Sequence, residues 1–169
     1  MTGNNPTDRS KLGTKRHILT DKNGIPLSVV MSSANTHDIK LVTDVMDNMV
    51  VKRSSSSSSS TKCNSSRKGK LQHLCLDKVY NSQSVKQAII KRGYVSHIPY
   101  KRNKGQKIWA VCQKKYPAAK NRRWVVERTN SWHNRFRKLF TRYEKKAENY
   151  LGLAQLSCST IVYRKVVLG

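Results

Sequence analysis

The spacing of apolar residues predicts a β-hairpin followed by a helix in the first third of the chain. The runs KRHILTD and IPLSVVMSSA, residues 15–21 and 25–34, are rich in residues that favour strands. Between them lie Asn23 and Gly24, a dipeptide typical of a tight hairpin turn. Thr36 and Asp38 are candidate caps for the helix that follows. The apolar residues of that helix recur at spacings of three and four, which predicts one buried face formed by Ile39, Val42, Val45, Met46 and Met49.

A strand, a helix and a second strand are predicted between residues 71 and 100. The segments LQHLCLD, residues 71–77, and YVSHIPY, residues 94–100, are short apolar runs that favour strands. The helix between them begins at Ser82 or Ser84 and stops at Gly93. Its inward-facing residues are Val85, Ala88 and Ile89.

Two further helices are predicted, over roughly residues 121–140 and 146–166. The second is rich in Leu, Ala, Val and Ile, so we expect it to be largely buried. The complete order is strand, strand, helix, strand, helix, strand, helix, helix. This alternation predicts an α/β fold.

Two stretches have no such periodicity. Residues 52–70 include seven consecutive serines at 54–60, which cannot bury a core, so we interpret this stretch as a flexible linker within one domain of residues 1–169. Residues 101–120 are basic and read as a solvated loop that contains Trp109 and Tyr116. These aromatic residues could stack on bases or anchor the loop to the core, and the sequence leaves both open.

Net charge narrows the class of partner. Thirty-four Lys and Arg against nine Asp and Glu give a formal charge of +25. Such a charge repels itself in the compact state and therefore indicates a polyanionic partner, with nucleic acid first and an anionic membrane surface as the rival. No apolar run is long enough to span a bilayer, and the N-terminal residues lack the apolar core of a signal peptide.

The four cysteines do not indicate a metal site. They are far apart in the sequence and include no C-x-x-C pair, so neither zinc nor a disulfide framework is supported. We interpret them as free thiols in a reducing compartment. They are Cys63, Cys75, Cys112 and Cys158.

Two acidic residues are candidates for chemistry. Asp77 follows an apolar strand, where a carboxylate faces the crevice that binds ligands in α/β sheets, although a cap or turn role is equally open. Glu127 is the one acid in RRWVVERTNSWHNRFRKL, residues 122–139. A rotation of 100° per residue places it away from the apolar stripe of Val125, Trp132, Phe136, Leu139 and Phe140.

Glu127 has two interpretations. It could be an exposed side chain paired with neighbouring arginines. Alternatively, it could hold a divalent cation, because a carboxylate beside a phosphate repels it unless a cation lies between them. Carboxylate-bound Mg²⁺ is the usual partner of phosphoryl chemistry.

The sequence resembles the DDE transposases of bacterial insertion sequences, in the group with an R-x-x-x-E signature. The resemblance covers nearly the whole chain and is interrupted at the serine-rich stretch. The motifs that carry it are NPTDRSKLGTKRHILTD, SSANTHD, HLCLDKVYNS, RGYVSHI, RRWVVERTNSWHNRFRKL and RYEKKAENYLGLAQLSC.

The resemblance implies an RNase H-like mixed sheet with flanking helices. It also implies three carboxylates that hold two Mg²⁺ or Mn²⁺ ions for strand cleavage and strand transfer in DNA transposition. Asp77 matches the second acidic position of the family and Glu127 the third. Arg123 matches the signature arginine, which positions Glu127 or holds a phosphate. A basic residue is favoured about two turns beyond the glutamate, where Arg135 and Lys138 are candidates.

Three departures from the family pattern bear on activity. The family's first aspartate lies on a central strand upstream of N-P-T-D-R, so we expect that strand and its carboxylate to be absent from this chain. Val79 and Asn81 replace the usual Gly and Asp, and Val79 would be strained if that position needs a positive φ. We therefore expect this chain alone to be inactive. It could be a decayed fragment, part of a two-frame element completed by an upstream reading-frame product, or a chain whose missing strand a partner polypeptide supplies.

The resemblance also implies partners and a location. The expected ligand is DNA, both the element ends and the target. The expected assembly is a homodimer, and the expected location is the nucleoid in the cytoplasm. A non-catalytic basic DNA- or RNA-binding protein is the alternative, and a membrane-surface or ribosome-associated protein comes third. The residues expected to contact DNA are Lys15, Arg16, Arg122, Arg128, Arg135 and Lys138.

Overall fold

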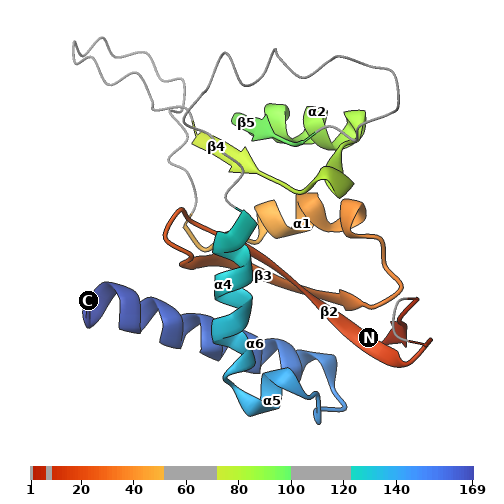
Figure 1. Cartoon of the computed structure of the whole chain (residues 1–169), viewed down its shortest axis with the longest axis vertical. Coiled ribbons are helices and arrows are strands. Elements are labelled where there is room, and N and C mark those ends of the chain that lie inside the picture. The colour runs from red at the N-terminus through yellow and green to blue at the C-terminus, as the bar shows by residue number, and fades with distance from the viewer. Residues whose placement is uncertain (1, 7–8, 52–71, 100–122) are drawn as a thin grey trace. The chain divides into compact units, whose positions relative to one another are not determined.

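The computed structural model describes residues 2–6, 9–51, 72–99 and 123–169 (Figure 1). The chain divides into two compact units. The larger unit comprises Met1–Val50 with Arg122–Gly169, and the smaller unit comprises Val51–Asn121. The predicted serine-rich linker and the predicted basic loop at 101–120 lie outside the described residues.

The larger unit contains the predicted hairpin. Strands β2 (Leu12–Thr20) and β3 (Pro26–Ser33) pair antiparallel, and the short strand β1 (Gly3–Asn4) pairs with the start of β2. One carboxylate oxygen of Asp21 accepts hydrogen bonds from the backbone N–H groups of Asn23 and Ile25, both at 2.8 Å. Gly24 has a φ of 83°, which suits a residue without a side chain. The hairpin prediction is therefore confirmed.

The helix after the hairpin is short and begins as a 3₁₀ turn. This turn, η1 (Asp38–Leu41), leads into α1 (Val42–Asp47), whose Val42 and Met46 are buried. Figure 1 shows α1 on one side of the hairpin and α6 (Ala147–Val162) on the other.

The cap of this segment differs from both predicted candidates. The ring of His37, not Thr36 or Asp38, accepts the backbone N–H of Ile39, at 3.4 Å. The candidate side chains have other partners: the Thr36 hydroxyl bonds to the Ser33 hydroxyl at 2.7 Å, and the Asp38 carboxylate accepts from Lys15 at 3.0 Å. The Asp38 contact comes from a residue 23 positions away in the sequence, so the local pattern did not reveal it.

The smaller unit is a strand–helix–strand element, as predicted. Strands β4 (Gln72–Cys75) and β5 (Tyr94–His97) pair in parallel and are connected through α2 (Gln83–Lys91). The Ser82 hydroxyl caps α2 by accepting the backbone N–H of Val85 at 3.3 Å. Gly93, with a φ of 75°, follows the helix. Val85 and Ile89 are buried, as their spacing predicted.

The predicted helix over residues 121–140 is two helices. Helix α4 (Arg123–Asn134) ends before Phe136, whose extended backbone has φ −83° and ψ 103°, and α5 (Arg137–Phe140) follows. The break directs Leu139, which is only 2% exposed, into a core with Met31, Tyr150 and Ala154. Tertiary packing thus overrides a continuous helical pattern.

Helix α6 is less buried than its composition predicts. Its buried residues are Tyr150, Ala154, Ser157 and Ile161, whereas Leu156 is 63% exposed. A single π-helical turn, η3 (Tyr163–Val167), continues it and has no buried residue. Only one stripe of this apolar helix meets the rest of the larger unit, so the expectation of a largely buried helix was wrong.

These elements confirm an α/β fold. Among the described residues, the strands form a three-stranded antiparallel sheet and a separate two-stranded parallel sheet. No helix in the described part of the chain has the length and apolar character to cross a membrane.

Candidate functional site

Asp77 lies just beyond a parallel strand of the smaller unit. The backbone N–H of Leu76 still donates to the carbonyl of His97 at 3.0 Å, so the β4–β5 ladder reaches the residue before Asp77. Its carboxylate Oδ1 accepts the backbone N–H of Lys78 at 2.7 Å and caps the 3₁₀ turn η2 (Lys78–Tyr80). Asp77 therefore lies just beyond the end of a strand and also caps the turn that follows it.

The replacement of glycine by Val79 causes no backbone strain. Val79 lies within η2 and is 42% exposed. Among the described residues, the non-glycine residues with positive φ are Arg9 and Ser10. The strain considered for Val79 is therefore absent.

Glu127 is exposed on α4 of the larger unit. The buried stripe of this helix is formed by Val125, which is 4% exposed, together with Thr129 and His133, which are both 0% exposed. The prediction that Glu127 leaves the core-facing stripe is confirmed. The membership of the stripe differs from the prediction: Thr129 and His133 were not assigned to it but are buried, whereas Trp132 is half-buried and Phe140 is 71% exposed.

The hairpin turn holds the helix that carries Glu127. The Thr129 hydroxyl donates to the carbonyl of Gly24 at 2.7 Å, and the Arg128 guanidinium donates to the carbonyl of Asn23. A Cβ on Gly24 would lie 3.0 Å from both Arg128 Nη2 and Thr129 Oγ1. Only a glycine lets the turn approach α4 this closely. The Asn23-Gly24 dipeptide therefore forms the turn and also allows its contact with α4.

Arg128 lies between two indole rings. Its guanidinium carbon is 4.8 Å from the ring centroid of Trp124 and 5.0 Å from that of Trp132. The ammonium group of Lys165 lies 5.2 Å from the Trp132 centroid. Residues 124, 128 and 132 are spaced by four along α4, so their side chains form a ladder of aromatic rings and cations on one side of the helix.

His133 is buried where α4 packs on α6. Its Nδ1 lies 3.3 Å from the Ser157 hydroxyl, which itself donates to the carbonyl of Ala154, so Nδ1 carries the proton and Ser157 accepts it. Its Nε2 lies 3.6 Å from the sulfur of Cys158. Burial raises the pKa of the Cys158 thiol to about 11, so the thiol is protonated and donates to Nε2.

The charge state of His133 follows from the same surroundings. Burial, with the nearby Arg16 charge as a second cause, lowers the pKa of His133 from 6.5 to about 4. The ring is therefore neutral at neutral pH. Sequence inspection missed this group, although a 100° rotation from Val125 places both Thr129 and His133 near the same stripe.

The family of the chain is decided by comparison with known proteins. A family model described as the transposase DDE domain matches residues 2–161. The chain belongs to the DDE transposase family. It is also 32% identical over 166 residues to the Burkholderia cepacia protein named "Putative transposase for insertion sequence element IS402"; the match covers 96% of this chain and 68% of that protein. No solved structure shows a significant match.

DDE transposases act on DNA and generally use divalent metal ions. Asp77 and Glu127 offer carboxylate oxygens, the ligands that Mg²⁺ and Mn²⁺ prefer, so their donor chemistry fits such an ion. The two residues belong to different units. Within the described residues, no group of three or more His, Cys, Asp or Glu side chains is arranged to hold a metal.

Three of the residues expected to contact DNA have partners within this DDE transposase chain. Lys15 forms an ion pair with Asp38 at 3.0 Å. Arg16 donates to the carbonyl of Leu139 at 3.3 Å and to the Asn134 side chain at 2.7 Å. The third is Arg128, which donates to the hairpin turn.

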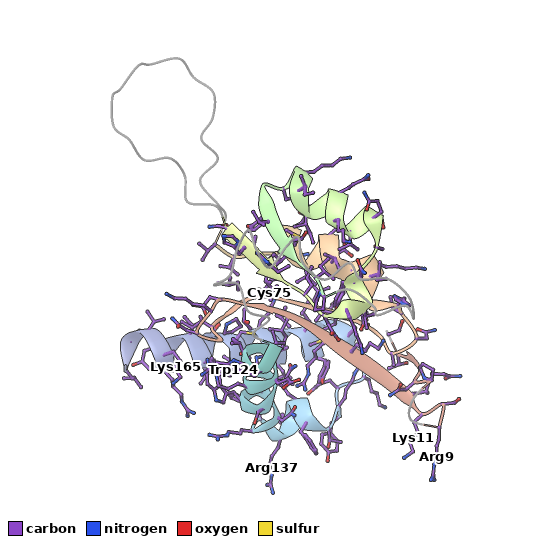
Figure 2. All side chains as sticks on the ribbon, turned by 45° about the horizontal axis from the view of Figure 1, so that its top comes forward. Arg9, Lys11, Cys75, Trp124, Arg137 and Lys165 are labelled. Carbon is purple, nitrogen blue, oxygen red and sulfur yellow. The ribbon has the colours of Figure 1, made fainter. Side chains whose placement is uncertain are left out.

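The remaining candidates divide between exposed and undescribed positions. Arg135 and Lys138 are exposed near the junction of α4 and α5. Figure 2 shows Arg137, in the same region, projecting away from the ribbon. Arg122 lies outside the described residues, and for Arg123 the backbone alone is described.

Proposed function

We propose that this chain forms part of the metal-dependent catalytic core of an insertion-sequence transposase, with Asp77 and Glu127 as two of the carboxylate ligands. The observation that carries the proposal is the exposure of Glu127 on α4 in a chain of net charge +25. The family match over residues 2–161 supports the same function. A metal site that binds phosphate requires an exposed carboxylate to hold the ion and cations nearby to attract the phosphate.

Each residue has a distinct task in this proposal. Asp77, whose carboxylate is oriented by its bond to the Lys78 N–H, serves as one metal ligand in this proposal. Glu127 supplies a further ligand from a helix that the hairpin turn holds in place. When bound, the divalent ion activates the attacking hydroxyl and stabilises the leaving oxygen. Arg123, Arg135 and Lys138 position Glu127 or neutralise phosphates.

The third carboxylate is proposed to come from a further strand. In an RNase H-like sheet, one central strand pairs on both sides and carries an aspartate. The antiparallel β2–β3 pair and the parallel β4–β5 pair are the two kinds of pairing that such a strand would join. We therefore propose that cleavage requires a strand that supplies this aspartate in addition to Asp77 and Glu127.

Cleavage of labelled DNA tests the assignment. The chain is fused to a segment that supplies the third aspartate and is assayed with Mg²⁺ or Mn²⁺ on duplexes that carry the element ends. Asp77→Asn and Glu127→Gln remove one ligand each at nearly constant shape, and Asn still caps a helical turn. Each variant should abolish cleavage while DNA affinity stays equal or rises, because a negative charge is lost.

Matched controls separate a ligand from a generic acid. Asp44 and Glu148 are exposed acids on α1 and α6, so Asp44→Asn and Glu148→Gln should leave cleavage unchanged. Persistent cleavage in Asp77→Asn or Glu127→Gln would overturn the catalytic assignment. DNA binding without any metal-dependent cleavage by the fused chain would favour the alternative, a non-catalytic basic DNA-binding protein.

A further inference from the structure

Two histidines from different strands of the smaller unit meet on one face of the β4–β5 sheet. Nδ1 of His73 lies 2.8 Å from Nε2 of His97, and the two ring centroids are 5.0 Å apart. The strands pair in parallel with Cys75 opposite His97, and His73 lies two residues before Cys75 on β4. Because side chains alternate along a strand, these three residues share one face, whereas Leu74 lies on the other face and is buried.

This face of the sheet is accessible from solution. His73 and Cys75 are exposed and His97 is half-buried. Figure 2 shows Cys75 on β4. Burial, with the nearby His73 as a second cause, lowers the pKa of His97 from its usual value of 6.5. The His97 ring is therefore neutral at neutral pH, and a neutral imidazole has a nitrogen lone pair that can bind a metal ion.

We propose that His73 and His97 together bind one divalent transition-metal ion of the Zn²⁺ class. Two nitrogens bound to one such ion at about 2.0–2.1 Å lie about 2.8–3.4 Å apart, from square to tetrahedral geometry. The observed distance of 2.8 Å lies at the lower end of this range. The ion takes the place of the proton between the two nitrogens, and the ring that donated this proton carries it on its other nitrogen instead. A small rotation of each ring then directs both lone pairs at the ion.

The nitrogen ligands select a different ion from the carboxylates of the proposed function. Imidazole suits Zn²⁺, Cu²⁺ and Ni²⁺, whereas carboxylates suit Mg²⁺ and Mn²⁺. The net charge of +25 opposes any cation that is held by charge alone. Coordination by two neutral nitrogens provides a bond that does not depend on a negative charge. The site is thus separate from the proposed function of Asp77 and does not rest on it.

The Cys75 thiol is a neighbour of this site and not one of its ligands. Across the described ranges, no three or more His, Cys, Asp or Glu side chains are placed to hold a metal, so water completes the coordination of the ion. The bound ion links β4 to β5, which have four residues each. Because the ion binds the paired strands and not the unfolded chain, it stabilises the smaller unit.

The test titrates Zn²⁺ into the whole 169-residue chain, prepared without a histidine tag, by isothermal titration calorimetry. His73→Gln and His97→Gln should each weaken Zn²⁺ binding at least about tenfold, since loss of even an outer partner of a metal ligand typically costs 10- to 100-fold. Excess Mg²⁺ should not displace the Zn²⁺, because nitrogen ligands disfavour it. In the unmodified chain, Zn²⁺ should also shift the imidazole proton resonances of both histidines, a readout that needs no variant to fold.

Two variants are matched controls. Cys75→Ala removes an exposed donor on the same face, and His37→Asn removes an exposed histidine of the larger unit while Asn still caps the turn there. Both should retain the Zn²⁺ affinity of the unmodified chain. Undiminished affinity in either His73→Gln or His97→Gln, loss of binding in Cys75→Ala, or unshifted His73 and His97 resonances overturns the histidine site.

Discussion

Acidification should destabilise the larger unit through His133. The folded state lowers the pKa of this buried imidazole from 6.5 to about 4, mainly through burial and secondarily through Arg16. Protonation would place a second N–H against the Cys158 thiol, which already donates to that nitrogen. The folded state therefore prefers the neutral ring, whereas the unfolded chain accepts a proton at the ordinary pKa.

The sign and size of the effect follow from linkage. Because the folded pKa is depressed, the stabilisation is fully present above the unfolded pKa of 6.5 and is lost as pH falls towards the folded pKa of about 4. Between these limits the free energy of unfolding falls by up to about 1.4 kcal/mol per pH unit. At a pH of about 5 the expected loss is about 2 kcal/mol, a large part of the stability of an ordinary domain.

Urea unfolding measured from about pH 7.5 to about pH 4.5 tests this linkage. His133→Gln should be less stable at neutral pH, and its stability should lack the acid-dependent loss due to His133. Burial also lowers the pKa of His17, so the informative quantity is the difference between the unmodified chain and the variant at each pH. A difference between the unmodified chain and His133→Gln that does not vary with pH would refute the reasoning.

Two further predictions concern how α4 and α5 are held. Gly24→Ala should lower the free energy of unfolding by about 1–3 kcal/mol, because the positive φ disfavours a side chain and the new Cβ would press on Arg128. Gly152→Ala, in α6 with open space around it, should instead stabilise by up to about 1 kcal/mol, and equal effects in a urea titration would contradict the turn argument. Leu139→Ala should cost about 2–5 kcal/mol because Leu139 is 2% exposed. Leu156→Ala should cost less than about 0.5 kcal/mol at 63% exposure, and similar costs for the two would show that the core is elsewhere.

Local patterns were sufficient for several parts of the fold and of the candidate site. Asn23-Gly24 predicted the hairpin because tight turns between strands often need a residue with positive φ, which Gly24 adopts. The placement of Asp77 after β4 and the exposure of Glu127 on α4 followed from strand boundaries and helical rotation. Each depends on neighbours within a few residues, which the sequence displays directly. The metal-binding roles of the two acids remain predictions.

Other features depended on residues that meet only in the folded chain. Lys15, Arg16 and Arg128 are cations in the sequence, but their partners Asp38, Asn134 and the hairpin carbonyls are about 20 to more than 100 residues away. No periodicity contains this information. Charge composition alone therefore could not distinguish these internally bonded cations from the exposed Arg135 and Lys138.

The same distinction explains the helices and His133. By itself, the sequence determined the type of the main strands and helices, the glycine of the hairpin turn and the side of α4 on which Glu127 lies, because these follow from short-range geometry. Only the tertiary structure decided that the helix breaks before Leu139, that α6 buries a single stripe, and that His133 is a neutral core residue. Burial is set by what packs against a surface, and that surface is assembled from segments far apart along the chain.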